Sequence, residues 1–318
     1  MSKYAKKTEA QQVEALEAVK AKVARAQEQL EQQLAALQTG DDWRKALEAM
    51  AVLGPTSISR FSFGNVVLLM AQRGPVGHAA TYKTWQRLGR NVKKGEHGAM
   101  ILRPRIVRRK GEDANGKPEE KKKLAGFSYL TVFSLDQTDG PELPKMLPPS
   151  DISTPAGFPH TVEALTRLVR HVEGVNGITL RPRETGDHRT AEGWFHKPSK
   201  QIVVITGEKS EAQTLSTLLH EVAHAVLHGD EHHATPTAEV EAESTAYVVS
   251  HALGLDTAAY SLPYVATWAN RSDEKNPTKA VARVGERIRK AANIILEALC
   301  PALADDVDEE AAQRERAA

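Results

Sequence analysis

The feature that most constrains this chain is a predicted helix at residues 211–228 that carries two histidines four positions apart. Ser210 and Gln213 form a capping box at its start. Gly229 stands where the C-terminus of a helix favours glycine. Leucine, valine and alanine make the segment apolar over most of its girth, which predicts that the helix is buried. The two histidines share one face of this helix, because residues four apart project from the same side.

The sequence HEVAH at residues 220–224 of this helix indicates a zinc site. Neutral imidazoles at this spacing can both bind one Zn²⁺ at about 2.0–2.1 Å. Glu221 lies beside His220 and His224, where its carboxylate can accept a proton from water during hydrolysis. A surface helix with two incidental histidines is the alternative. However, a buried His-Glu-His without a metal would leave polar groups unsatisfied, so we predict His220 and His224 as ligands and Glu221 as catalytic.

A catalytic zinc site needs a third protein ligand and an open position for water. His228 lies on the same helix face but about 12 Å along the axis from His220, so we expect it to pack beside the site or to support a ligand. The next predicted helix carries Glu239 and Glu243 on one face. We assign Glu239 as the third ligand and Glu243 as the carboxylate that orients a histidine. The reverse assignment, or two solvated charges, remains the alternative.

Composition divides the chain into two expected domains, each with an α+β fold. The length of 318 residues is enough for about two domains. Residues 5–38 contain no glycine or proline and are rich in Ala, Glu, Gln and Lys, which predicts one long helix. The expected divisions are a helix at 1–40, a first domain at 41–140, a proline-rich linker at 141–158, a second domain at 159–300 and a charged tail at 301–318.

Hydrophobic periodicity gives a coarse order of elements. The predicted helices beyond the first are 43–53, 64–73, 160–173, 211–228, 236–252 and 276–299. The predicted strands are 99–107, 127–133, 178–182, 193–196 and 201–205, with a polar hairpin tip at 110–123. We expect strand 201–205 to lie at a sheet edge, where it could pair with an extended peptide.

A basic stretch runs from residue 85 to residue 123. It holds 13 Lys and Arg against five acidic residues, so its net charge is +8, while the whole chain is near neutral. Aromatic side chains flank this stretch. Cations that contact phosphates, together with rings that stack on bases, are what a single-strand binding surface requires. The alternative is a solvated hairpin whose aromatic side chains form a small core.

The cysteine content and the lack of long apolar segments indicate the cellular compartment in which we expect the protein. Cys300 is the only cysteine, which excludes an intramolecular disulfide and fits a reducing compartment. The first residues lack the apolar core of a secretory signal. No apolar run approaches the roughly 20 residues that span a bilayer. We therefore expect a cytoplasmic protein with no membrane partner.

Several motifs together resemble those of the ArdC-type antirestriction proteins of plasmids and phages. The N-terminal resemblance rests on SFGNVVLL at 62–69, YKTWQRLGRNVKKGE at 82–96 and VFSLDQTDG at 132–140. The C-terminal resemblance rests on HEVAH and on EVEAES at 239–244, which is also similar to the ImmA/IrrE-like peptidases. The resemblance implies an N-terminal single-stranded-DNA-binding domain and a C-terminal zincin-like metallopeptidase domain.

We accordingly expect DNA contacts from the basic stretch and its flanking rings. The expected DNA-binding residues are Tyr82, Trp85, Arg90, Lys93, Lys94, Arg103, Arg105, Arg108 and Arg109. The expected function is a zinc metallopeptidase that hydrolyses an unknown protein substrate and also binds single-stranded DNA. The alternative is a non-catalytic protein that coats single-stranded DNA, shields it from restriction nucleases and holds a structural metal.

Overall fold

The chain folds into two compact units in a computed structural model. Unit 1 comprises Met1–Gln33 and Val67–Pro141, and unit 2 comprises Leu34–Val66 and Glu142–Ala318. The structure describes residues 9–37, 39–53, 60–112, 118–143, 157–186, 189–229, 235–255 and 276–300. The predicted tail at 301–318 and most of the predicted linker lie outside these ranges.

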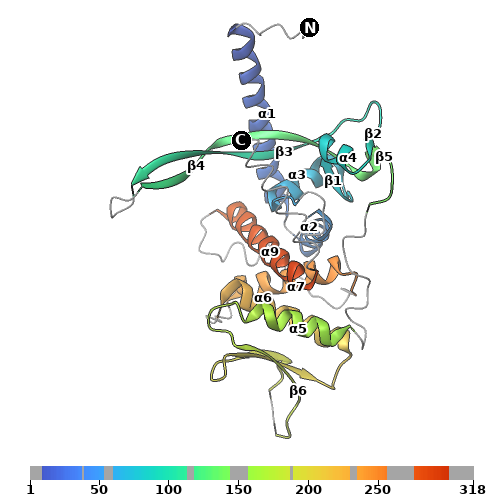
Figure 1. Ribbon diagram of the computed structural model, residues 1–318, viewed down its shortest axis with the longest axis vertical. Coiled ribbons are helices and arrows are strands. Elements are labelled where there is room, and N and C mark those ends of the chain that lie inside the picture. The colour runs from blue at the N-terminus through green and yellow to red at the C-terminus, as the bar shows by residue number, and fades with distance from the viewer. Residues whose placement is uncertain are drawn as a thin grey trace. The chain divides into compact units, whose positions relative to one another are not determined.

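Unit 1 combines one long helix with two small antiparallel sheets (Figure 1). Strands β1 (Ala79–Thr81), β4 (Pro118–Ser134) and β3 (Ala99–Glu112) form one sheet in that order. The second sheet pairs β2 (Asn91–Val92) with β5 (Thr138–Asp139). The other elements are α1 (Glu9–Ala36), α4 (Tyr82–Arg87), the 3₁₀ helix η1 (Leu135–Gln137) and, from residue 67 onward, α3 (Phe63–Arg73).

The core of unit 1 includes apolar side chains from one face of α1. Val23 and Ala26 are buried together with Leu68 of α3 and Leu102 of β3. Strands β3 and β4 pair from Ala99 to Glu112, further than the sequence predicts, with a register shift after Pro104. Strand pairing therefore extends into the expected hairpin tip on both sides.

Unit 2 places helices on a three-stranded sheet. The strand order is β6 (Gly177–Pro182), β8 (Gln201–Thr206), β7 (Gly193–His196), with β6 parallel and β7 antiparallel to β8. Helix α6 (Glu211–His228) packs against β8 and β7, while α5 (Phe158–Val169) packs against β6 (Figure 1). Helices α7 (Pro236–Ala252) and α9 (Pro277–Leu299) contact α6 in turn. The expectation that strand 201–205 lies at an edge is wrong, because β8 is paired on both sides.

Helix α2 (Gly40–Leu53) belongs to unit 2, so the expected first domain at 41–140 is divided in the structure. The Trp43 side chain is fully buried, and its indole N–H donates to Ser244 Oγ of α7 at 3.0 Å. The Tyr247 hydroxyl donates a hydrogen bond to the Glu48 carboxylate at 2.9 Å. The sequence pattern shows that α2 is amphipathic, but it does not show that its partner lies about 200 residues later.

The α+β fold class with two domains is confirmed. The predicted helices and the predicted strands of unit 2 lie within a few residues of their expected bounds, for example α7 at Pro236–Ala252 and β7 at Gly193–His196, whereas β3 and β4 extend well beyond theirs. Helix α4 and strands β1, β2 and β5 are not among the predicted elements. Strands of two or three residues, and a helix of six residues, are too short to show a hydrophobic period.

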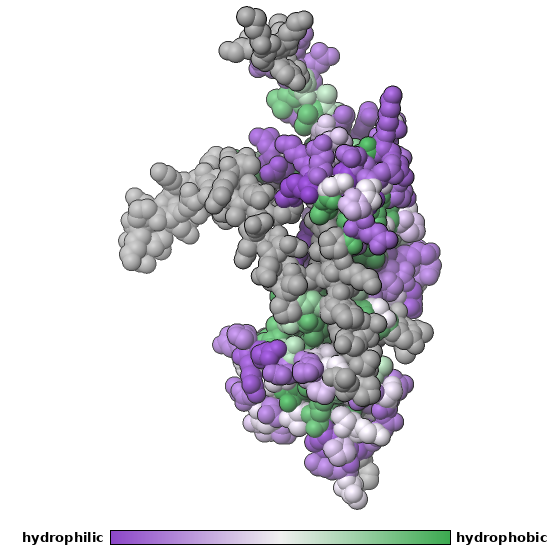
Figure 2. All heavy atoms as spheres, turned by 45° about the vertical axis from the view of Figure 1, so that its right-hand side comes forward, coloured by the Kyte–Doolittle hydropathy of each residue, from purple (hydrophilic) through white to green (hydrophobic). Residues whose placement is uncertain are grey.

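The described surface is mainly polar on the face that Figure 2 shows. In the view of Figure 2, hydrophilic side chains cover most of the coloured surface and hydrophobic ones form interrupted patches. This distribution is ordinary for side chains that face water. Within the described residues, no helix combines the length and the apolar character that crossing a bilayer requires.

Candidate functional site

Helix α6 fixes the position of the two histidines. The Ser210 hydroxyl accepts a hydrogen bond from the Gln213 backbone N–H, and the Gln213 side chain accepts one from the Ser210 backbone N–H. The predicted capping box is therefore present. The helix ends at Gly229, whose φ of +62° is a conformation that glycine adopts without strain. Leu215, Leu218 and Leu219 are fully buried. The local sequence therefore sets both ends of the helix, and its apolar face holds the helix against the sheet.

Three side chains converge on one point between α6 and α7. His220 Nε2 and His224 Nε2 are 3.1 Å apart. Glu239 Oε2 lies 3.6 Å from His220 Nε2, and Glu239 Oε1 lies 3.6 Å from His224 Nε2. One ligand atom from each of the three residues lies within 4.8 Å of the others, so they could hold a metal ion. Two imidazoles and one carboxylate are a donor set that fits a divalent transition metal.

Glu243 lies behind the metal-facing atoms. Its Oε2 accepts a hydrogen bond from His220 Nδ1 at 3.0 Å, which leaves Nε2 of His220 as the lone-pair donor toward the cluster. Burial lowers the pKa of His220, but the hydrogen bond to Glu243 and the nearby carboxylates outweigh it and raise the pKa above its ordinary value. The neighbouring His224 lowers the pKa of Glu239. These carboxylates favour positive charge at the cluster.

Glu221 is buried on the sheet side of the cluster, with 8% of its surface exposed. Burial raises the pKa of its carboxyl group above the ordinary value, although the two histidines act in the opposite direction. A Cβ atom added at Gly193 of β7 would lie 2.7 Å from Glu221 Cγ and 2.8 Å from Glu221 Oε1. Gly193 is therefore needed for Glu221 to occupy its place. Sequence reasoning missed this glycine, because nothing local to 193 indicates the contact.

His228 lies one turn beyond His224, with their ring centroids 5.8 Å apart. It does not reach the cluster formed by the three donors. Its Nε2 lies 3.5 Å from Glu241 Oε2, and the Arg287 guanidinium of α9 approaches its Nδ1 at 3.5 Å. Arg287 also donates to Glu241 Oε1 at 2.7 Å. Neither Arg287 nor Glu241 is among the predicted site residues.

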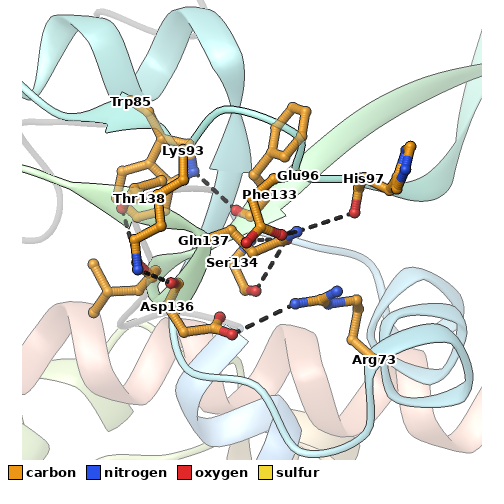
Figure 3. A network of polar contacts seen from close by, with 11 residues as sticks. Arg73, Trp85, Lys93, Glu96, His97, Phe133, Ser134, Asp136, Gln137 and Thr138 are labelled. Carbon is orange, nitrogen blue, oxygen red and sulfur yellow. Dashed lines mark hydrogen bonds and ion pairs between the residues drawn. The ribbon is translucent and has the colours of Figure 1, made fainter.

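Some predicted DNA-binding residues lie on the surface of unit 1. Tyr82 is 47% exposed, and its ring packs edge-on against Phe133 with centroids 6.5 Å apart. Lys93 is also exposed, although its ammonium donates to the Asp136 carbonyl at 2.8 Å (Figure 3). The side chains of Lys94, Arg103 and Arg105 are exposed as well. Arg108 and Arg109 lie on β3 opposite Lys122 and Lys121 of β4.

Two predictions need correction. Trp85 is fully buried, and its indole N–H donates to the Phe133 carbonyl at 2.8 Å (Figure 3). Its ring is therefore part of the core and cannot stack on a base in this conformation. The Arg90 side chain is also buried and donates to the Thr138 hydroxyl at 2.9 Å and the Thr138 carbonyl at 3.0 Å. This guanidinium fixes the chain around β5 and is not available to a phosphate.

The Gln137 side chain connects segments of unit 1 near the exposed residues Lys93 and Lys94. Gln137 Oε1 accepts from the Ser134 backbone N–H at 3.1 Å, and Gln137 Nε2 donates to Glu96 at 2.6 Å and to the His97 carbonyl at 3.0 Å (Figure 3). The side chain is almost fully buried. It joins η1 to the loop between β2 and β3, which also carries Lys93 and Lys94. Gln137 lies in the motif at 132–140 on which the family resemblance rests, but the contacts of its side chain are evident only in the three-dimensional structure.

Two sequence families match the chain. Residues 13–134 match the N-terminal domain of the anti-restriction factor ArdC. Residues 175–269 match the IrrE N-terminal-like domain, and this range contains His220, His224 and Glu239. The first match includes α2, which packs in unit 2.

Curated proteins with similar sequences are longer than this chain. An uncharacterized protein of Bacillus anthracis is 27% identical over 274 residues, covering 74% of this chain and 46% of that protein. The DNA primase TraC of Escherichia coli is 25% identical over 260 residues, covering 71% of this chain and 17% of the primase. The chain thus spans less than half the length of these relatives.

Solved structures of the antirestriction protein ArdC from plasmid R388 are also similar to this chain. The metal-free structure is 22% identical with a TM-score of 0.45, and the Mn(II)-bound structure is 21% identical with a TM-score of 0.42. Each comparison covers 76% of this chain and 86% of the other. The family matches show that the chain joins an ArdC-type N-terminal domain to an IrrE N-terminal-like domain.

Proposed function

We propose that unit 2 is a zinc-dependent peptidase. The observation that carries this proposal is the convergence of His220, His224 and Glu239 beside the buried carboxylate of Glu221. Only these three donors converge within the described residues, which fits a catalytic zinc site better than a structural site with four protein ligands. Glu239 has 51% of its side chain exposed, so solvent reaches the cluster from its side.

Each residue has a separate part in hydrolysis. When bound, Zn²⁺ acts as a Lewis acid toward the peptide carbonyl and acidifies water. Glu221 accepts the proton of the attacking water and returns it to the leaving amine. Its raised pKa supports this exchange, because a base works best when its pKa approaches the working pH. Glu243 holds His220 in the tautomer and ring orientation that binding requires.

An extended substrate peptide could pair with β7, instead of with the strand 201–205 that the sequence suggests. Among the described strands, β7 pairs with β8 on one side only and forms an edge of its sheet. Gly193 at the start of β7 lies against Glu221. We infer that the substrate backbone pairs with the outer edge of β7, which would bring its peptide bond past Glu221.

Unit 1 is proposed to bind single-stranded DNA. Lys94, Arg103 and Arg105 are exposed on β3 and the loop that precedes it, and the family match to the ArdC N-terminal domain supports this assignment. Tyr82 is the exposed ring placed to stack on a base. The combined proposal is an antirestriction-type protein that binds single strands and cleaves a protein target.

The first experiment measures metal content. Purified protein should hold about one zinc per chain, and His220→Ala and His224→Ala should each lose it. His171→Ala, an exposed histidine of unit 2, is the matched control and should retain it. Unchanged zinc content in both cluster variants would refute the metal site.

The second experiment separates catalysis from binding. Glu221→Gln should keep the zinc and the fold while peptide cleavage falls about 10²–10⁴-fold. Glu211→Gln on the same helix should leave cleavage unchanged. A wild-type protein that cleaves no peptide, yet protects single-stranded DNA from nucleases, would favour the alternative of a non-catalytic DNA-binding protein.

A further inference from the structure

A cavity of about 490 Å³ lies in unit 2 next to the metal cluster. Its walls come from the end of α6, the first turns of α7 and one face of α9, through Leu227, His228, Thr235, Thr237, Arg283 and Arg287. Glu241 also lines it. This volume is within the range that encloses a small ligand or a substrate side chain. The proposed peptidase mechanism uses none of these residues.

The described residues that line the cavity carry a surplus of positive charge. Glu241 is 3% exposed and is paired with Arg287 Nε at 2.7 Å. Arg287 also donates to the Leu227 carbonyl at 3.1 Å, so this pair ties α6, α7 and α9 together. Arg283 is exposed and forms no hydrogen bond or ion pair with any described residue. Two guanidinium groups against one carboxylate leave a net charge of about +1 when His228 is neutral.

The N-terminus of helix α7 adds to the positive electrostatic potential in the cavity. It begins at Pro236 with Thr235 as its cap, and Thr237 and Ala238 of its first turn line the cavity. The first turn of a helix carries backbone N–H groups without partners in the helix and a partial positive charge. The Ala238 N–H is already bonded to the Thr235 hydroxyl oxygen, so the Thr237 N–H and hydroxyl remain for a ligand. Together with the Arg283 guanidinium, which no described residue pairs, they favour an anion with hydrogen-bond acceptors.

The cavity adjoins the reacting groups. The His228 ring in its wall is 5.8 Å, centroid to centroid, from the ring of His224. Glu241 lies two residues after Glu239 and therefore on a different face of α7, so the His228 ring is the link between the cavity and the cluster. A group bound here would belong to a residue close to the peptide bond that is cleaved. A nucleic-acid phosphate has less support, because the exposed basic surface lies in unit 1.

We propose that this cavity is a specificity subsite that binds the carboxylate of an acidic side chain in the peptide substrate. The inference rests on the proposed peptidase function of the neighbouring cluster. Arg283 supplies the ion pair, and the first turn of α7 supplies hydrogen bonds. Arg287 mainly holds Glu241 in place.

The test uses the full-length, zinc-loaded Glu221→Gln protein and a random dodecapeptide library. Peptides retained by the immobilised protein are identified by mass spectrometry, and wild-type protein is tested for cleavage of the same library. We expect retained peptides to be enriched in Asp and Glu. Adding Arg283→Glu should reduce the binding of acidic peptides about tenfold or more and shift the selection toward Lys and Arg. Lys290→Glu, a charge reversal on the same helix outside the cavity, should leave the selection unchanged.

The outcomes separate the two proposals. Acidic selection that is lost with Arg283→Glu supports the subsite even when wild-type protein cleaves nothing, and in that case the peptidase proposal fails alone. No acidic selection, or selection that Arg283→Glu leaves intact, overturns the subsite. Competition by a single-stranded oligonucleotide that Arg283→Glu abolishes would assign the cavity to phosphate and overturn the peptide proposal.

Discussion

The cluster of His220, His224 and Glu239 in unit 2 and the basic surface of unit 1 hold their charged side chains in opposite ways. Glu221 and His224 are buried, and the ring of His220 is fixed by Glu243. Lys94, Arg103 and Arg105 extend into solvent. Proton transfer requires atoms held at a defined geometry, whereas attraction to a phosphate backbone works from mobile, solvated cations. The difference explains why a point change in unit 2 should have larger effects than one in the basic surface.

Trp85 and Arg90 break this division, because they lie in the basic stretch yet are buried and hydrogen-bonded. Trp85→Ala should therefore lower the free energy of unfolding of unit 1 by about 3–5 kcal/mol, the largest stability effect we predict. Thermal denaturation measures it. Tyr82→Ala, which removes an exposed ring, should leave the melting temperature almost unchanged. A stable Trp85→Ala protein with weakened strand binding would restore the stacking role that the structure denies.

Gly193→Ala tests how tightly the Glu221 carboxylate, the proposed general base, is held. The added methyl group would lie within 2.9 Å of Glu221 and Thr217, so the Glu221 side chain must move. A displacement of about 1 Å can cost about 10²-fold in rate. We expect peptide cleavage to fall by that order while zinc content is retained.

Gly77→Ala is the control, because a Cβ atom at Gly77 meets no atom within 4 Å. Full activity in Gly193→Ala would show that Glu221 is not held against β7. Loss of zinc together with activity would instead mean that the whole cluster has been disturbed.

Glu243→Gln sharpens the distinction between a ligand and the residue that orients it. The amide can no longer accept as strongly from His220 Nδ1, and loss of such a partner weakens metal binding about 10–100-fold. Competition with a chelator measures this change. Glu239→Gln should weaken binding more, because it alters a group that faces the cluster directly. A larger loss with Glu243→Gln would exchange the two roles.

What the sequence could predict depended on whether the signal was local. The capping box at Ser210 and the spacing of His220 and His224 are set within one helix, so α6 and the shared face of its two histidines were predictable. The spacing of Glu239 and Glu243 on the next helix predicted that they share one face, and the structure places Glu239 with the two histidines and Glu243 against His220 Nδ1. Gly193 and Arg287 were missed, because their partners lie on other elements of unit 2.

The same reason explains the division of the first domain. Trp43 is buried against α7 through Ser244, although the sequence places it in a continuous N-terminal region. A cut within residues 141–158 would therefore remove the partner of α2 from the N-terminal fragment. The isolated residues 1–140 are not expected to fold as one complete domain, and DNA binding is best measured on the full chain.

The smallest effect concerns the solvated cations. Lys94→Gln should weaken binding to single strands of any sequence only a few-fold, because one phosphate contact is lost and phosphates carry no sequence information. The slope of log affinity against log salt should become shallower by about 0.7 for that contact. Fluorescence anisotropy with labelled oligonucleotides at several salt concentrations measures both changes. Lys290→Gln in unit 2 is the matched control and should leave the slope unchanged. An unchanged slope for Lys94→Gln, or stronger binding of duplex than of single strands by the wild-type protein, would remove this loop from the DNA-binding surface.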